Sequence, residues 1–201
     1  MDADERLLRV ARTWGHGDPR VERAVARFSR VGEHGAIWLA IGVAGYALDK
    51  PRRPQWRRAT GTVAKAYALN TLIKLAVRRR RPELPGLPAL TSTPTQLSFP
   101  SAHASTSFAG ALAYTQLGLP MIPLYALAKA LAVSRLYLGV HYPSDVLAGA
   151  LLGTLTAFAN ADRRSALARE ARALATDPAD RAELAALREE LDEMSPPWPP
   201  D

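Results

Sequence analysis

Two histidines stand beside the starts of apolar stretches in this chain, each next to a proline and small polar residues. His103 follows Pro100-Ser101-Ala102, and His141 precedes Pro143-Ser144-Asp145. Ionisable side chains are costly in apolar surroundings and are usually kept there for a function. These positions are therefore the first candidates for chemistry.

The spacing of His141 and Asp145 fits an activated histidine. Pro143 favours the first turn of a helix, so His141 should lie just before that helix and Asp145 just inside it. A carboxylate there can accept a hydrogen bond from one imidazole nitrogen and leave the lone pair of the other pointing outward. The pair predicts a nucleophile, although the same pair also occurs as a simple helix cap.

The segment around Ser101 and His103 predicts the start of another helix. Free backbone N–H groups and the positive end of the helix dipole would lie beside both side chains and attract an anion. Helix capping alone is the alternative explanation.

Cations gather near the ends of two further apolar stretches. Lys74 is followed by a run of four arginines that Pro82 ends, and Arg135 closes a later stretch. Lys74, Arg78 and Arg81 have offsets of four and seven and would share one helical face. In isolation the arginine run also fits an anchor at lipid headgroups or a nucleic-acid patch.

The elements that must position these residues are apolar segments too long and too unalternating for strands. We predict an all-α protein, a membrane-embedded bundle of about five core helices. The predicted segments are Gly35–Leu48, Ala59–Val77, Ala102–Leu117, Pro120–Val133 and Val146–Ala159. Most are shorter than an ordinary membrane span, but their glycines and alanines suit close-packed membrane helices.

If these helices alternate in direction, the polar clusters meet at one end of the bundle. Three cations, a helix N-terminus and two histidines together describe a phosphate site. The predicted set is Lys74, Arg81, Ser101, His103, Arg135, His141 and Asp145.

Composition excludes several other classes of function. The chain has no cysteine, which removes thiolate metal sites, disulfides and cysteine nucleophiles. Its net charge of +7 favours an anionic partner. We expect a lipid phosphate substrate and membrane lipids as partners and no nucleic acid, because a nucleic-acid binder leaves both histidine clusters unexplained.

Charge also divides the chain. Residues 1–161 hold 20 Lys and Arg against 9 Asp and Glu, whereas residues 162–201 hold 6 against 10. We expect an N-terminal interfacial amphipathic segment over 1–33, a helical transmembrane domain over 34–161 and a polar acidic tail over 162–201. Leucines of the tail predict a short amphipathic helix over Asp180–Met194.

The three motifs in order resemble the signature of the type-2 phosphatidic acid phosphatase superfamily, which also includes vanadium haloperoxidases. The motifs are Lys74 with Arg81-Pro82, Pro100-Ser101-Ala102-His103, and Ser134-Arg135 with His141 and Asp145. Many members have glycine where this chain has Ala102. The resemblance covers roughly residues 34–160.

The resemblance implies a membrane phosphatase that needs no metal and no cofactor. His141 would attack phosphorus, Asp145 would orient His141, and His103 would protonate the departing oxygen. The phosphoryl oxygens would be held by Lys74, Arg81, Ser101 and Arg135.

Several family activities stay open at this point. The residues around Gly32-Glu33-His34 and Leu97–His103 look most like the actinobacterial branch that acts on polyprenyl-linked phosphates in cell-envelope synthesis. The alternatives are a phosphotransferase with the same intermediate and a phosphatidic acid or phosphatidylglycerol phosphate phosphatase. A haloperoxidase is disfavoured by size, and a metal hydrolase by the repulsion of nearby cations. We expect a multi-pass protein of the cell membrane with its site on the cytoplasmic side.

Overall fold

The computed structural model describes residues 3–13, 17–176, 182, 186–191 and 194. Over these residues the regular elements are helices, with two isolated β-bridges and no strand, which confirms the all-α prediction. The helices are α1 (Ala3–Thr13), α2 (Pro19–Arg30), α3 (Ala36–Leu48), α4 (Arg53–Val77), α5 (Ala102–Thr115), α6 (Met121–Tyr137) and α7 (Pro143–Thr176), with short 3-10 helices at Glu33–Gly35 and Lys50–Arg52.

The chain forms two compact units, Met1–Phe158 and Ala159–Asp201. The first contains both N-terminal helices together with the bundle. In the second, α7 continues to Thr176 and residues 186–191 are helical. The helix predicted over Asp180–Met194 lies largely outside the described residues.

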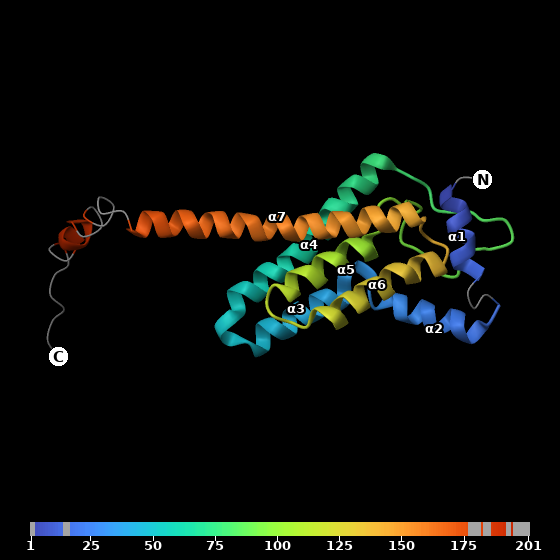
Figure 1. Ribbon diagram of the computed structural model, residues 1–201, viewed down its shortest axis with the longest axis horizontal. Helices are drawn as coiled ribbons and strands as arrows, with labels where there is room; N and C mark the ends of the chain where they lie inside the picture. Colours follow the sequence, from blue (N-terminus) through green and yellow to red (C-terminus); the bar gives the residue numbers. More distant parts are fainter. Residues whose placement is uncertain (1–2, 14–16, 177–181, 183–185, 192–193, 195–201) are drawn as a thin grey trace. The chain divides into compact units, whose positions relative to one another are not determined.

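Four helices build the apolar core of the first unit. Helix α4 packs against α3 and α5, and α5 packs against α6 (Figure 1). Trp38, Trp56 and Tyr114 are buried among them, and Tyr114 donates a hydrogen bond to the Trp38 carbonyl at 2.6 Å. This core holds together the helices that carry the polar clusters.

Two glycines let α7 approach the start of α5. A Cβ atom at Gly149 would lie 2.5 Å from the Ser101 carbonyl oxygen, and one at Gly153 would lie 2.1 Å from that of Ser105. Real Cβ atoms do not approach backbone so closely, so these positions require glycine. The close contact brings the first turn of α7 to the first turn of α5.

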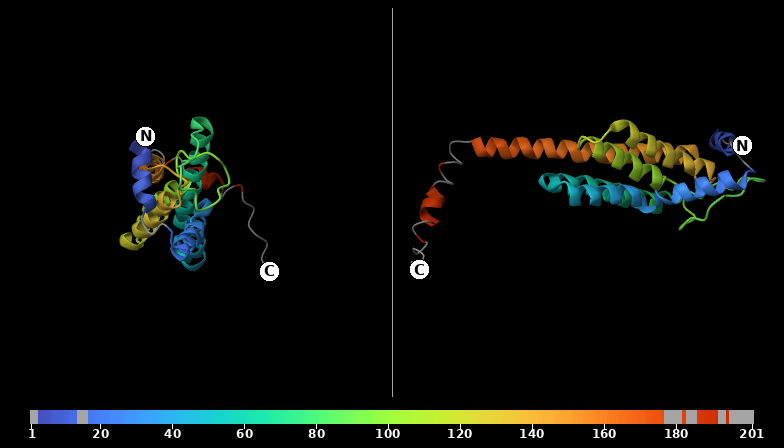
Figure 2. Two further views of the ribbon diagram at one scale, coloured as in Figure 1. Left: turned by 90° about the vertical axis from the view of Figure 1, so that its right-hand side faces the viewer. Right: turned by 90° about the horizontal axis from the view of Figure 1, so that it is seen from below.

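Helices α1 and α2 lie at the end of the bundle where the α4–α5 connection runs (Figures 1 and 2). Both pack against α6. Asp18 caps α2 through its side chain, and Leu8 and Arg12 of α1 are buried. Residues 1–33, which we expected to form an interfacial segment, therefore contribute helices to the same compact unit as the bundle.

The expectation that Lys74, Arg78 and Arg81 share a helical face was wrong. Helix α4 ends at Val77, and Arg78 takes a left-handed conformation with φ of 54°. A residue in that conformation turns the chain away from the helix axis, while its N–H still donates to the Lys74 carbonyl and closes the last turn. Arg81 reaches the site from the following irregular segment.

Apolar side chains also cover exposed faces of the bundle. Leu69, Leu72 and Leu75 on α4 and Leu147, Leu151 and Leu155 on α7 are exposed, at spacings that place each set on one face. Among the described residues, no single helix has both the length and the apolarity to cross a membrane. Pro19–Arg30 and Glu33–Leu48 meet that test only as a pair bent by 40°.

Candidate active site

The centre of the site is a contact between Arg81 and His141. Arg81 Nη1 lies 3.2 Å from His141 Nε2 and also donates to the Val140 carbonyl at 2.6 Å, while its Nε donates to the Thr95 carbonyl at 2.8 Å. A guanidinium group donates and never accepts, so His141 Nε2 must present its lone pair. The proton of the neutral ring is therefore on Nδ1.

Asp145 lies on the Nδ1 side of the same ring. Its Oδ2 is 3.6 Å from His141 Nδ1, longer than a hydrogen bond, and accepts from the Tyr142 backbone N–H at 2.8 Å. Helix α7 begins at Pro143, so His141 precedes the helix and Asp145 is in its first turn, as the sequence predicts. A shift of about half an ångström would complete the His141–Asp145 hydrogen bond, as catalytic contacts often do when substrate binds.

Burial controls the charge of this centre. His141 is 3% exposed and Asp145 is fully buried. Burial lowers the pKa of His141 to about 3; Asp145 opposes this, and the positive charges of Arg81 and Arg135 add to it. Burial also lowers the pKa of Arg81 to about 10. At neutral pH the site therefore combines an uncharged imidazole with a charged guanidinium.

A second arginine of the run holds the other oxygen of Asp145. Arg79 Nη1 donates to Asp145 Oδ1 at 2.9 Å and to Ser144 Oγ at 2.6 Å, and its Nη2 donates to Asp4 Oδ2 at 2.9 Å. The guanidinium also lies 3.9 Å from the centre of the Tyr142 ring. Sequence reasoning missed this role, because four consecutive arginines give no sign of which one turns inward.

Helix α1 completes that network through Asp4. Asp4 accepts from the Ser144 backbone N–H at 3.0 Å and from the Ser144 hydroxyl. The N-terminal helix is thus joined to the first turn of α7, next to His141. No motif pointed to this carboxylate, since it lies about 140 residues away in sequence from its partner.

His103 and Arg135 are joined by Ser29 of α2. His103 Nε2 lies 2.9 Å from the Ser29 carbonyl oxygen, which can only accept, so Nε2 carries a proton. Arg135 Nη1 donates to Ser29 Oγ at 2.8 Å. His103, Arg135 and Ser29 are all buried. Sequence reasoning did not single out this serine, which lies among exposed arginines of an amphipathic helix.

Lys74 and Ser101 hold the segment that opens α5. Lys74 Nζ donates to the carbonyls of Leu97, Ser98 and Pro100 at 3.0–3.2 Å. Ser101 is the N-cap of α5, and its backbone N–H donates to the Asp145 carbonyl at 2.9 Å. The helix N-terminus predicted at Ser101 and His103 is present and lies against the start of α7.

The residues predicted from sequence are thus linked to one another in one region. Arg81, His141, Asp145 and Ser101 form a continuous chain of contacts, and Lys74 binds the carbonyl next to Ser101. The Val140 N–H donates to the Arg135 carbonyl. Arg135, which also binds Ser29, therefore lies close to the segment that holds His141.

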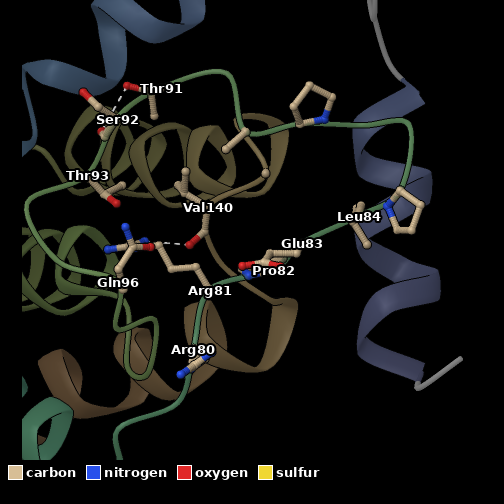
Figure 3. A pocket seen from close by; sticks show the side chains of 14 residues that line it. Arg80, Arg81, Pro82, Glu83, Leu84, Thr91, Ser92, Thr93, Gln96 and Val140 are labelled. Carbon is tan, nitrogen blue, oxygen red and sulfur yellow. Dashed lines mark hydrogen bonds between the residues drawn. The ribbon is translucent and has the colours of Figure 1, made fainter.

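A cavity of about 980 Å³ with both polar and apolar lining residues adjoins Arg81 (Figure 3). Glu83 lies on one side of the arginine, and Thr91, Ser92, Thr93 and Gln96 lie on the other. Val140, the residue before His141, forms part of its wall. The cavity offers hydroxyl, amide and carboxylate groups beside Arg81. Within the described part of the chain, no three His, Asp or Glu side chains are grouped to hold a metal ion.

The chain matches a family model and several known phosphatases. The family model "PAP2 superfamily" matches residues 56–164. A decaprenylphosphoryl-5-phosphoribose phosphatase of Mycobacterium tuberculosis (strain CDC 1551 / Oshkosh) is 44% identical over 134 residues, which cover 65% of this chain and 73% of that protein.

Two solved structures share the fold. A transmembrane PAP2-type phosphatidylglycerolphosphate phosphatase from Bacillus subtilis superposes with a TM-score of 0.67 at 23% identity, over 81% of this chain and 85% of that one. LpxE of Aquifex aeolicus superposes with a TM-score of 0.64 at 21% identity, over 81% of this chain and 96% of that one.

Proposed function

The chain belongs to the PAP2 superfamily and is a phosphatase, and from this premise we propose that it hydrolyses a polyprenyl-linked phosphate through a phosphohistidine intermediate. The observation that carries the proposal is the contact of Arg81 Nη1 with His141 Nε2. A lone pair beside a fixed cation is what attack on a phosphoryl group needs. The 44% identity to a polyprenyl-linked phosphatase supports the choice of substrate class.

The proposed reaction has two displacements. His141 Nε2 forms a bond to phosphorus as the bond from phosphorus to the lipid oxygen breaks, and His103 gives that oxygen a proton. Water then attacks phosphorus, the phosphorus–nitrogen bond breaks, and His103 takes a proton from the water. Two modest barriers replace one high barrier.

Fixed positive charge would stabilise both transition states. Lys74, Arg81 and Arg135 would hold the equatorial oxygens, together with the N-terminal N–H groups of α5 near Ser101. Lys74 Nζ would exchange one or more of its three carbonyl partners for phosphate oxygens. Arg135 is already fixed by Ser29, so less ordering remains when substrate binds.

Arg79 and Asp4 have a positioning role in this proposal. Arg79 holds one oxygen of Asp145, which leaves the other directed at His141 Nδ1. Asp145 then keeps the proton of the ring on Nδ1 and stabilises the positive charge that develops as Nε2 attacks. The two residues act through Asp145 and do not touch the phosphate.

The protein is a membrane phosphatase, and we further propose that it is multi-pass with its site facing the cytoplasm. Exposed leucines on α4 and α7 would face lipid. Arginines are abundant in residues 20–30 and 78–81, at the end of the bundle that bears the site, and this supports a cytoplasmic orientation. The cavity beside Arg81 would receive a hydroxyl-bearing headgroup.

Phosphate release from detergent-solubilised lipids tests the proposal. The panel contains polyprenyl mono- and diphosphates, a polyprenyl lipid that ends in a sugar phosphate, phosphatidic acid and phosphatidylglycerol phosphate, all with EDTA present. We expect turnover of a polyprenyl substrate by the wild type and none by His141→Ala. Turnover of only the glycerolipids, or wild-type rates in His141→Ala, would overturn it.

A further inference from the structure

Asn70 is a buried amide of α4 that the proposed reaction does not use. Its side chain is fully buried, one helical turn before Lys74. Asn70 Nδ2 donates to the Pro100 carbonyl at 3.1 Å and to Ser105 Oγ at 2.9 Å. A backbone carbonyl only accepts hydrogen bonds, so the amide nitrogen, and not the amide oxygen, faces the start of α5.

The amide oxygen of Asn70 is buried and has no hydrogen-bond partner in the described part of the chain. An apolar side chain of similar size would fill the same space without leaving a buried polar atom unpaired, which destabilises a protein. What the amide adds is therefore the pair of bonds that its nitrogen donates. Both bonds go to the segment that opens α5.

Asn70 and Lys74 share one acceptor. Lys74 Nζ donates to the Pro100 carbonyl at 3.0 Å and also to the carbonyls of Leu97 and Ser98. In the proposed reaction, Lys74 leaves one or more of these carbonyls to bind phosphate oxygens. The Pro100 carbonyl would then keep its bond from Asn70.

The second bond of Asn70 reaches the first turn of α5. Ser105 Oγ accepts from Asn70 and donates to the Ser101 carbonyl at 3.0 Å. Ser101 is the N-cap of α5, and the free N–H groups of this turn are among those proposed to hold the phosphate. Gly149 of α7 packs closely against the same Ser101 carbonyl. The turn is therefore held from α4 through Asn70 and from α7 through this contact.

We propose that Asn70 is a positioning residue, which holds the first turn of α5 in place when Lys74 turns from the backbone carbonyls to the phosphate. Without Asn70, this movement of Lys74 would leave the Pro100 carbonyl without either side-chain partner. It would thus loosen the turn whose N–H groups bind the same phosphate. The inference rests on the function proposed above and adds how the helix N-terminus stays fixed while the lysine moves. Asn70 does not touch the phosphate.

Asn70→Leu, which removes both bonds and keeps a side chain of similar size, tests this inference. We expect KM and the inhibition constant of inorganic phosphate each to rise about tenfold, because binding of either would leave a buried carbonyl unpaired. The change in kcat should be smaller, since the loss affects bound substrate and transition state alike. Unchanged values of both constants would overturn the inference.

Ser107→Ala is the matched control. It also removes a buried hydrogen bond between α5 and another helix, the one that Trp38 Nε1 donates to Ser107 Oγ at 2.9 Å. Both constants should stay unchanged in this variant. Asn70→Asp provides a second test if Asn70→Leu folds poorly. Its carboxylate has the same shape, cannot donate to the Pro100 carbonyl and attracts the Lys74 ammonium group, so KM should rise at least as much.

Hydrogen exchange of the backbone amides of residues 97–105 separates this role from a merely structural one. Without phosphate, Lys74 still holds the Pro100 carbonyl in Asn70→Leu, so exchange should stay within about threefold of the wild type. With saturating inorganic phosphate, the same segment should exchange about tenfold faster in the variant than in the wild type. Faster exchange by one factor in both states, or no difference in either, would overturn the inference.

The inference and the proposed function fail separately. If Asn70→Leu behaves as the wild type while turnover still depends on His141, the inference is overturned and the proposed function stands. Wild-type rates in His141→Ala would overturn the proposed function, and the inference would fall with it.

Discussion

Arg81 Nη1 lies 3.2 Å from His141 Nε2, and the guanidinium is the donor in this contact. The contact fixes the tautomer of His141, because the arginine has no lone pair to offer. When a phosphate binds, Arg81 would turn its N–H groups to the phosphoryl oxygens and release the lone pair of Nε2. In the proposed reaction the same residue would thus hold the lone pair of His141 before the substrate binds and hold the substrate afterwards.

The lowered pKa of His141 predicts how its charge depends on pH. The neutral ring is the nucleophilic form, and a pKa of about 3 keeps it neutral throughout the physiological range. Nitrogen NMR of histidine-labelled protein, with the resonance assigned by His141→Gln, should show no titration of this ring between pH 8 and pH 5. A midpoint between pH 6 and pH 7 would contradict the account of a buried, cation-flanked imidazole.

Arg79→Gln tests whether Arg79 positions Asp145. We expect kcat to fall about 10- to 100-fold with KM nearly unchanged, as loss of an outer hydrogen-bond partner of a catalytic group does. The His141 ring should keep its tautomer in the same titration, because Arg81 still faces Nε2. Arg78→Gln is the control, because Arg78 is exposed and its side chain donates, within the described part of the chain, to the Leu75 carbonyl and not to Asp145. Equal losses in both variants would exclude the positioning role.

Asp4→Asn tests the link between α1 and the site. The asparagine keeps the shape of the side chain but removes the charge that pairs with Arg79. We expect kcat to fall less than in Arg79→Gln, because Arg79 still contacts Asp145. The double variant should be no worse than Arg79→Gln alone, since the two residues act through one contact. Additive losses in kcat would show that Asp4 acts by another route.

Ser29→Ala tests whether α2 helps to position Arg135 for substrate binding. The variant removes the hydroxyl that accepts from Arg135 but keeps the carbonyl that accepts from His103. We therefore expect KM to rise about three- to tenfold with a smaller change in kcat, since a charged hydrogen bond is lost. Thr154→Ala is the control, because the Thr154 hydroxyl donates to the Ala150 carbonyl of its own helix. A loss confined to kcat would indicate that the hydroxyl serves His103 instead.

His103→Ala should reveal the proton donor through the leaving group. General acid catalysis contributes about 10²- to 10⁴-fold when the departing oxygen is basic. Hydrolysis of an alkyl phosphate should therefore fall by that factor, while hydrolysis of an aryl phosphate with an acidic phenol should fall far less. Rates measured on a matched pair of such esters check this. Equal losses for both esters would contradict the assignment of His103 as the acid.

Much of the site could be predicted from the sequence, because its residues lie at helix ends that a proline or a capping serine marks. Pro143 places His141 and Asp145 on either side of the start of α7, and Ser101 caps α5. The apolar segments likewise predict the bundle. The end of the apolar segment at Val77 was predicted, but the turn that follows it was not, because an arginine has no special preference for the left-handed conformation that Arg78 adopts.

The supporting residues were not predictable because their contacts join distant parts of the chain. Asp4 and Ser29 lie in helices that pattern alone describes as charged and amphipathic. Their partners are fixed only when α1 and α2 pack on α6. Arg79 differs from its neighbours in the run only by the direction its side chain takes after the turn at Arg78.

The stereochemical course at phosphorus tests the central claim most directly. A substrate whose terminal group is a chiral, oxygen-labelled thiophosphate is hydrolysed in water that contains a third oxygen isotope, and the configuration of the released thiophosphate is determined. Attack by His141 followed by attack by water inverts phosphorus twice, so we predict net retention. Net inversion would mean that water displaces the lipid in a single step, and it would contradict the phosphohistidine intermediate.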